Sequence, residues 1–235
     1  ILVYFLIKNN TAYQKIFFYS LIPAILAVVV LFFVREKKIK KEEVIAKPKI
    51  SFRKDFKNLD SRLKAYLVVS FIFTLGNSSN QFLLLRAKNL GFSFTDVILL
   101  YFVYNLSYAL SSFPAGKLSD KLGRKLFLVI SYIIYSLVYF GFALNQTTSI
   151  ILFLFIFYGF YMGFNEATEK AFISEIAPSH LKATLIGLQA TIVGLGLFPA
   201  SLLAGILWKF FGPQIAFLFG SLMSILACVG LLLFI

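Results

Sequence analysis

The sequence is poor in the residues that form disulfides, metal sites and charged surfaces. It contains 1 cysteine, Cys228, and 1 histidine, His180, so an intrachain disulfide is excluded and neither residue suggests a metal site. Charged residues make up 14% of the chain, whereas a typical soluble domain has about a quarter. Residues 126–165 carry no charge at all. These shortages argue against an ordinary soluble domain.

The chain is instead rich in long apolar runs. Hydrophobic residues make up 60% of it, and phenylalanine alone occurs 29 times. About 20 apolar residues in a helix, at about 1.5 Å each, cross a hydrocarbon core of about 30 Å. The polar turn at 145–149 divides the long uncharged stretch. We therefore predict an all-α, polytopic transmembrane helical bundle with spans at residues 16–34, 65–85, 97–115, 126–144, 150–170, 183–208 and 215–235.

The net charge of +13 is a signal of membrane topology and does not require a nucleic-acid partner. Of the 23 lysines and arginines, 12 lie within residues 35–64, 4 within 116–125, and 2 are Lys170 and Lys182. These 18 fall in loops on one side of the predicted spans, and the other 5 fall opposite. Short loops rich in lysine and arginine stay in the cytoplasm. We therefore expect a plasma-membrane or inner-membrane protein with these loops cytoplasmic.

A break in composition separates the first span from the rest. Residues 35–64 carry 12 basic and 5 acidic residues and little sustained apolar periodicity. Two interpretations stay open: a solvated linker, or a partly amphipathic segment whose second half lies on anionic lipid headgroups. In either case, the segment divides the chain into two unequal pieces.

One polar turn, residues 116–125, lies between two uncharged spans. It reads Gly-Lys-Leu-Ser-Asp-Lys-Leu-Gly-Arg-Lys. The turn resembles the signature loop of the major facilitator superfamily, Gly-x-Leu-x-Asp-Arg/Lys-x-Gly-Arg/Lys-Arg/Lys, and it has the flanking spans that this motif requires. An ordinary positive-inside hairpin would explain the cations but neither the two glycines nor the acid. The matching residues are Gly116, Leu118, Asp120, Lys121, Gly123, Arg124 and Lys125.

The resemblance implies a fold of twelve helices in two six-helix halves. Residues 1–34 would then be the end of the N-terminal bundle, comprising the tail of helix five and helix six. Residues 35–64 would be the cytoplasmic linker, and residues 65–235 the C-terminal six-helix bundle. The rest of the N-terminal half, on this view, belongs to the same polypeptide and lies outside this chain.

The resemblance also assigns roles within the turn. Asp120 would cap a helix N-terminus or pair with a cation across the bundle interface. Gly116 and Gly123 would permit a tight turn. Lys121, Arg124 and Lys125 would contribute charge contacts and anchor the turn to lipid. Together, these residues would form a cytoplasmic latch.

The implied function is secondary active transport of a small molecule by alternating access, as a symporter or antiporter, with no cofactor and no enzymatic activity. Proton coupling, and the choice between drug efflux and metabolite carriage, stay open at this point. Alternatives are a passive uniporter and a non-transporting receptor or scaffold on the same fold. The expected partners are a small-molecule substrate, protons and membrane lipids, including anionic headgroups.

Amide and phenol side chains inside the spans mark a candidate substrate cavity. Asn77, Asn80 and Gln81 are spaced to share one helix face, and Asn105 has tyrosines one turn away on either side. Buried polar groups in a membrane face a bundle interior or a wet cavity, although hydrogen bonding between helices explains them equally well. Spans without such residues, 126–144 and 215–235 among them, are expected at the periphery. The candidate cavity residues are Asn77, Asn80, Gln81, Tyr104, Asn105, Tyr108 and Gln189.

Glu166 is the candidate for proton coupling. It lies in span 150–170, deeper than Glu169, and a carboxylate reached alternately from both sides would carry a proton. Glu166 and Lys170 are also spaced i, i+4 with the acid first, which is the favourable order for a plain ion pair. Both interpretations stay open from the sequence.

Overall fold

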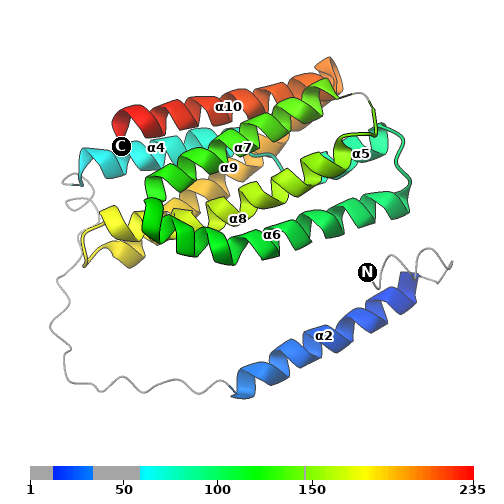
Figure 1. The fold of residues 1–235 in the computed structure, drawn as a ribbon, viewed down its shortest axis with the longest axis horizontal. Coiled ribbons are helices and arrows are strands. Elements are labelled where there is room, and N and C mark those ends of the chain that lie inside the picture. Colours follow the sequence, from blue (N-terminus) through cyan, green and yellow to red (C-terminus); the bar gives the residue numbers. More distant parts are fainter. Residues whose placement is uncertain (1–12, 34–58, 146) are drawn as a thin grey trace.

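A computed structural model describes residues 13–33, 59–145 and 147–235. The predicted tail at residues 1–7 and most of the predicted linker lie outside these ranges. Every regular element that the described residues form is an α-helix, so the predicted all-α class is confirmed (Figure 1). Six of the described helical segments are long and apolar enough to cross a membrane.

The helices from α4 to α10 run back and forth between two ends of one bundle (Figure 1). We name these ends after residues. At the Gly123 end α6 meets α7 and α8 meets α9; at the Arg86 end α5 meets α6, α7 meets α8, and α9 meets α10. The described helices are α2 (Tyr13–Phe33), α4 (Ser61–Gly76), α5 (Gln81–Asn89), α6 (Phe94–Leu122), α7 (Arg124–Leu144), α8 (Ile151–Ile176), α9 (Lys182–Phe211) and α10 (Pro213–Phe234).

Local signals explain where the helices begin and end. Ser93 and Asp96 form a capping box at the start of α6, in which each side chain accepts a hydrogen bond from the other residue's backbone N–H. Pro213 is the first residue of α10, where its missing N–H costs nothing. The predicted turn at 116–125 is shorter than expected, because α6 continues to Leu122. Gly123 alone separates α6 from α7, with a φ of +100° that favours glycine.

The predicted span 65–85 is not one continuous helix. α4 ends at Gly76 and α5 begins at Gln81, so Asn77, Asn80 and Gln81 do not share a face of one helix, and that prediction is wrong. The intervening sequence, Asn-Ser-Ser-Asn, carries short polar side chains that compete with the helix for backbone hydrogen bonds. A turn of four residues therefore interrupts the span.

Glycines bring α6 and α8 into backbone contact. A Cβ placed on Gly159 would lie 2.6 Å from the carbonyl oxygen of Tyr104 and 2.5 Å from Ser107 Cβ. One placed on Gly163 would meet Ser111 Oγ and, at 3.1 Å, the backbone nitrogen of Ser112. Small residues allow helices to approach closely in a membrane, where packing replaces the hydrophobic effect as the driving force.

Aromatic rings fill the centre of the bundle. Phe73 of α4 stacks on Tyr132 of α7 at 4.1 Å between ring centroids, and Tyr135 stacks on Tyr139 at 4.0 Å. Tyr161 of α8 meets Tyr135 edge-on at 4.8 Å. Stacked and edge-on geometries are the favoured ones for aromatic pairs. These contacts fix α4, α7 and α8 against one another.

The helices expected at the periphery are not the most exposed. In an apolar stretch of 18 residues within α7, 61% of residues are buried inside the bundle, compared with 22% in the corresponding stretch of α6 and 17% in that of α9. α7 is buried because its tyrosines pack against α4 and α8, whereas α6 and α9 present large apolar side chains such as Phe113 and Phe198. Every side chain described on α2 is also exposed. Broad apolar faces of α6 and α9 are thus left uncovered.

Gly159→Ala is expected to destabilise the bundle, because the new methyl group meets a backbone carbonyl that cannot rotate away. Overpacking of this kind costs about 1–3 kcal/mol. Thermal unfolding in detergent measures the effect. Gly187→Ala on α9 is the matched control, since no atom outside the adjoining residues and backbone of its own helix lies within 4 Å of its Cβ position, and alanine favours a helix by about 1 kcal/mol. An equal melting temperature for Gly159→Ala and the parent would contradict the packing described.

Candidate polar site and signature turn

A polar cluster lies where α4 gives way to α5. Tyr158 donates a hydrogen bond from its hydroxyl to Asn80 Oδ1 at 2.7 Å, and Asn80 Nδ2 donates to the Tyr104 hydroxyl at 3.4 Å. Asn77 Nδ2 donates to the Tyr161 hydroxyl at 3.3 Å. The three tyrosines are buried. We name these five residues the tyrosine–asparagine cluster.

The cluster offers hydrogen bonds and aromatic faces without any charge. Each amide and each phenol both donates and accepts hydrogen bonds. The ring of Tyr158 lies 5.3 Å from that of Tyr104 and 5.3 Å from that of Tyr161, measured between centroids. Phenol rings and amides of this kind can stack on aromatic groups and exchange hydrogen bonds with polar ones.

The other predicted cavity residues lie elsewhere. Gln81 is exposed and lines a groove of about 380 Å³ between α5 and the start of α6, together with Lys88 and apolar side chains. Asn105 donates to the carbonyl oxygen of Tyr101 on its own helix, at 2.7 Å. The structure therefore brings together Asn77, Asn80 and Tyr104 and separates them from Gln81 and Asn105.

A second polar group lies nearer the Gly123 end, around Glu166 and Glu169 of α8. The Tyr108 hydroxyl donates to Glu166 Oε2, so this predicted cavity residue contacts the predicted proton carrier directly. Gln189 of α9 donates from Nε2 to Glu169 Oε1 at 2.5 Å, and Asn165 Nδ2 lies 3.5 Å from Glu169 Oε2. Side chains from α6, α8 and α9 thus meet at Glu166 and Glu169.

Glu166 and Lys170 form no ion pair, although both are among the described residues. Tyr108 of α6 is the hydrogen-bond partner of Glu166 instead. Glu166 lies farther from the end of α8, but Glu169 is the more enclosed carboxylate, being half-buried where Glu166 is exposed. The position of a carboxylate along the span therefore does not predict how far its side chain is buried.

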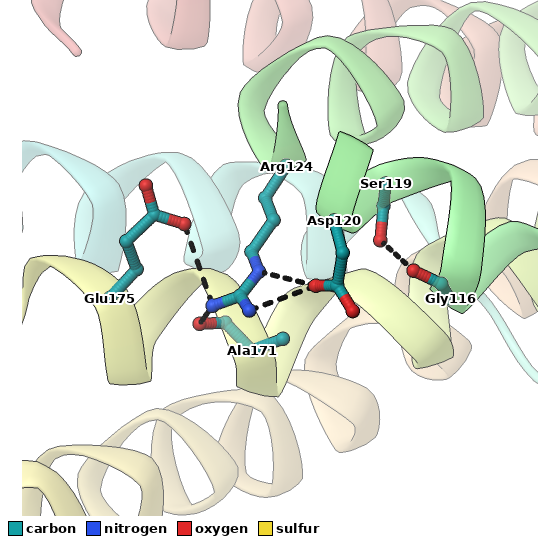
Figure 2. Close-up of polar contacts among 6 residues, drawn as sticks. All are labelled: Gly116, Ser119, Asp120, Arg124, Ala171 and Glu175. Atoms are coloured by element: carbon teal, nitrogen blue, oxygen red, sulfur yellow. Dashed lines mark hydrogen bonds and ion pairs between the residues drawn. The ribbon is translucent and has the colours of Figure 1, made fainter. Parts of the chain in front are cut away.

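Arg124 is the centre of the signature turn, residues 116–125 (Figure 2). Its Nη2 donates to Asp120 Oδ1 at 2.9 Å, and its Nε lies 3.2 Å from the same oxygen. Its Nη1 donates to the carbonyl oxygen of Ala171 at 2.7 Å and lies 3.4 Å from Glu175 Oε2. Asp120 belongs to α6, Arg124 begins α7, and the other two belong to α8. One guanidinium therefore joins three helices at the Gly123 end.

The turn departs from expectation in two respects. Asp120 pairs with a cation of its own bundle and caps no helix, since the cap of α7 is Gly123 without a side-chain hydrogen bond. Gly116 lies inside α6, where its carbonyl accepts a hydrogen bond from the Ser119 hydroxyl at 2.8 Å. A tight turn is therefore required of Gly123 only. Lys121 is exposed, and lipid anchoring by the turn stays a prediction.

Two residues of the tyrosine–asparagine cluster, Tyr158 and Tyr161, are not among the residues that the sequence predicted. Tyr158 and Tyr161 were passed over because only amides and charges were counted within span 150–170. Their spacing, i and i+3 on the helix that also carries Glu166, was the available signal. Within the described residues, no group of three histidine, cysteine or acidic side chains is placed to hold a metal ion.

The Major Facilitator Superfamily model matches residues 66–235, which is most of the chain. The chain belongs to the major facilitator superfamily. The resemblance drawn from residues 116–125 is thus confirmed, and with six candidate spans the protein is a multi-pass membrane protein.

Relatives give the extent of the likeness. An uncharacterized MFS-type transporter of Methanocaldococcus jannaschii is 38% identical over 235 residues, covering 97% of this chain and 57% of that protein. The quinolone resistance protein NorA of Staphylococcus aureus is 30% identical over 142 residues, covering 60% of this chain and 36% of NorA. The chain therefore spans 57% or less of the length of these relatives.

Tyr158→Phe is expected to lower stability by about 0.5–2 kcal/mol, because it leaves Asn80 Oδ1 without its 2.7 Å donor inside the bundle. Thermal unfolding of the purified protein measures the loss. Tyr101→Phe is the control, since 42% of Tyr101 is exposed. Equal melting temperatures for the two variants would show that the hydrogen bond at Asn80 contributes nothing.

Proposed function

We propose that this chain forms the C-terminal six-helix half of a secondary active transporter that works by alternating access. The observation that carries the proposal is the uncharged tyrosine–asparagine cluster at the break between α4 and α5. Transporters bind substrates at interrupted helices within the membrane, where backbone and polar side chains are free to meet a ligand. Family membership supports the same conclusion.

The proposed substrate is a small neutral or amphipathic aromatic molecule. The ring faces of Tyr104, Tyr158 and Tyr161 and the amides of Asn77 and Asn80 match that chemistry. The likeness to a protein named for quinolone resistance favours a drug-like substrate over a metabolite. No carboxylate belongs to the cluster itself, so a strongly cationic substrate fits it less well.

A second six-helix half is proposed to cover the exposed faces of α6 and α9. Phe113 of α6 is 81% exposed and Phe198 of α9 is 74% exposed, which is a large apolar surface for a helical bundle to leave open. Residues 1–34 would belong to that half, 35–64 would link the halves, and 65–235 would form the half described. The site would then lie between the two halves.

The Gly123 end is proposed to face the cytoplasm. The Gly123 end is the more basic of the two. It carries Lys117, Lys121, Arg124, Lys125, Lys170 and Lys182, whereas the Arg86 end carries Arg86, Lys88 and Lys209. The positive-inside rule places the more basic loops in the cytoplasm. Arg124 would then act as the cytoplasmic latch, since it joins α6, α7 and α8 at that face.

Proteoliposomes that contain the native full-length polypeptide test the function, with a fluorescent quinolone as the probe. We expect flux that follows an imposed pH gradient and falls roughly 5- to 10-fold in Asp120→Asn. Expression should persist, because the Asp120 side chain is 61% exposed and such pairs contribute only about 0–1 kcal/mol.

Lys117→Gln removes an exposed charge from the same turn and serves as the matched control. Flux at the parent level in Asp120→Asn would contradict the latch. Absence of flux from the parent, with binding of the probe retained, would indicate a receptor or scaffold. Flux that ignores every imposed ion gradient would indicate a uniporter.

Glu166 is proposed as the proton carrier because Tyr108 connects it to α6 one turn from Tyr104 of the cluster. In Glu166→Gln, the amide oxygen still accepts from Tyr108 but no proton is exchanged. We expect pH-driven flux to be lost while downhill exchange of substrate continues. Glu169→Gln, which keeps its hydrogen bond from Gln189, is expected to retain pH-driven flux. The reverse result would assign coupling to Glu169.

A further inference from the structure

One arginine is buried at the end of the bundle opposite the signature turn. Arg86 of α5 is only 2% exposed. Its Nη2 donates to the carbonyl oxygen of Asn145 at 2.6 Å, its Nε to that of Phe142 at 3.2 Å, and its Nη1 to Asn89 Oδ1 at 3.0 Å. All three sides of the guanidinium are thus occupied.

Two of the three partners of Arg86 are backbone carbonyl oxygens and the third is the side-chain amide oxygen of Asn89, so none of them is a carboxylate. Phe142 and Asn145 lie in the last turn and at the cap of α7, where carbonyl groups lack helical partners and the helix dipole is negative. A guanidinium fork matches two such oxygens at once. A buried charge without partners is costly. While α5 is in place, the contact between Arg86 and the end of α7 is therefore strongly favoured.

α5 is a separate segment that this contact holds down. It has 9 residues and is disconnected from the helical hydrogen-bond ladder of α4 by the break at 77–80. Leu83, Arg86 and Ala87, spaced i, i+3 and i+4, are its buried residues. The rest of α5 borders the groove that Gln81 lines. Arg86 is therefore the polar attachment of α5 to α7.

The position of α5 is linked to the candidate site. Asn80 immediately precedes α5 and holds Tyr104 and Tyr158 through its side chain. A rotation of α5 about the break would move Asn80 and with it the hydrogen bonds that its side chain forms with Tyr104 and Tyr158. Arg86 and the cluster are thus connected through α5 and Asn80, although no hydrogen bond between described residues joins them directly.

The two ends of the bundle carry matching contacts. At the Gly123 end, Arg124 donates to the carbonyl oxygen of Ala171 near the end of α8. At the Arg86 end, Arg86 donates to carbonyl oxygens at the end of α7. In both cases, a guanidinium from one helix binds the C-terminal part of a neighbour.

We propose that Arg86 is a latch that keeps α5 closed over the site at the face opposite the signature turn. It is a positioning residue for the transport cycle, and the inference rests on the proposed function. α5 swings open when the bonds of Arg86 to α7 break, and it closes when they form again. Arg86 and Arg124 then each hold one face.

Side-specific labelling of a cysteine tests the latch. Tyr101→Cys, on the exposed side of α6 next to Tyr104, is introduced into the native full-length polypeptide after Cys228 and any other cysteine are replaced by serine. A membrane-impermeant maleimide is applied to one face at a time in oriented vesicles. In Arg86→Gln we expect the labelling rate from the Arg86 face to rise by a factor on the order of ten, with no rise from the Gly123 face.

Two milder variants protect the test against misfolding. Arg86→Lys keeps the charge and loses the fork, and Asn89→Ala keeps the guanidinium and its bonds to α7 while removing one partner. We expect a smaller rise from the Arg86 face in each. Arg124→Gln is the matched control and should raise labelling from the Gly123 face.

The latch would be overturned if the labelling rate stayed at the parent value in Asn89→Ala and in every Arg86 variant that folds. An equal rise in labelling from both faces would overturn it as well. Labelling needs no substrate, so the two proposals fail separately. A rise in labelling from the Arg86 face alone, in a protein that shows no flux, would support the latch and contradict the proposed transport function. Flux with unchanged labelling would leave transport and remove the latch.

Discussion

Hydrocarbon offers no hydrogen bonds, and this constraint governs the break at 77–80. A backbone group left unpaired in a membrane costs several kcal/mol, so an interrupted helix exists only where the protein supplies partners. Here the Tyr135 hydroxyl donates to the carbonyl oxygen of Gly76 at 2.8 Å, and the backbone nitrogen of Ser79 donates to Ser201 Oγ at 3.3 Å. Helices α7 and α9 thus complete the hydrogen bonding that α4 gives up.

The same need explains why charge is placed at the two ends. Arg86 binds carbonyl oxygens in the last turn and at the cap of α7, where the helix leaves acceptors unpaired, and Arg124 binds the carbonyl oxygen of Ala171 within the last two turns of α8. Between the ends, the described bundle is held by tyrosine rings and by the glycine contacts of α6 with α8. Strong directional contacts therefore lie at the faces, and softer aromatic contacts surround the site.

The spans followed from the sequence because the length of an apolar run is set by the membrane, and short polar turns separate them. The break did not follow. Asn77, Asn80 and Gln81 fit both a helix face and an interruption, and the choice depends on Tyr135 and Ser201, which lie 59 and 122 positions away from their partners.

The polar site was predicted in part for a related reason. The structure places Asn77, Asn80 and Tyr104 in one cluster, because strongly polar residues within a span turn toward the interior of the bundle. Tyrosine is ambiguous, because its ring packs like phenylalanine while its hydroxyl bonds like serine, and only the neighbours decide which matters. The uncharged stretch of 40 residues, 126–165, within α7 and α8 also has a consequence for biogenesis. Its connection contains no lysine or arginine to set its side of the bilayer, and the charge that meets it, on Arg86, is synthesised two helices earlier. The basic turn at 116–125 is therefore the signal that orients this stretch, and the carbonyl groups at the end of α7 meet an arginine on a segment that the ribosome has already delivered.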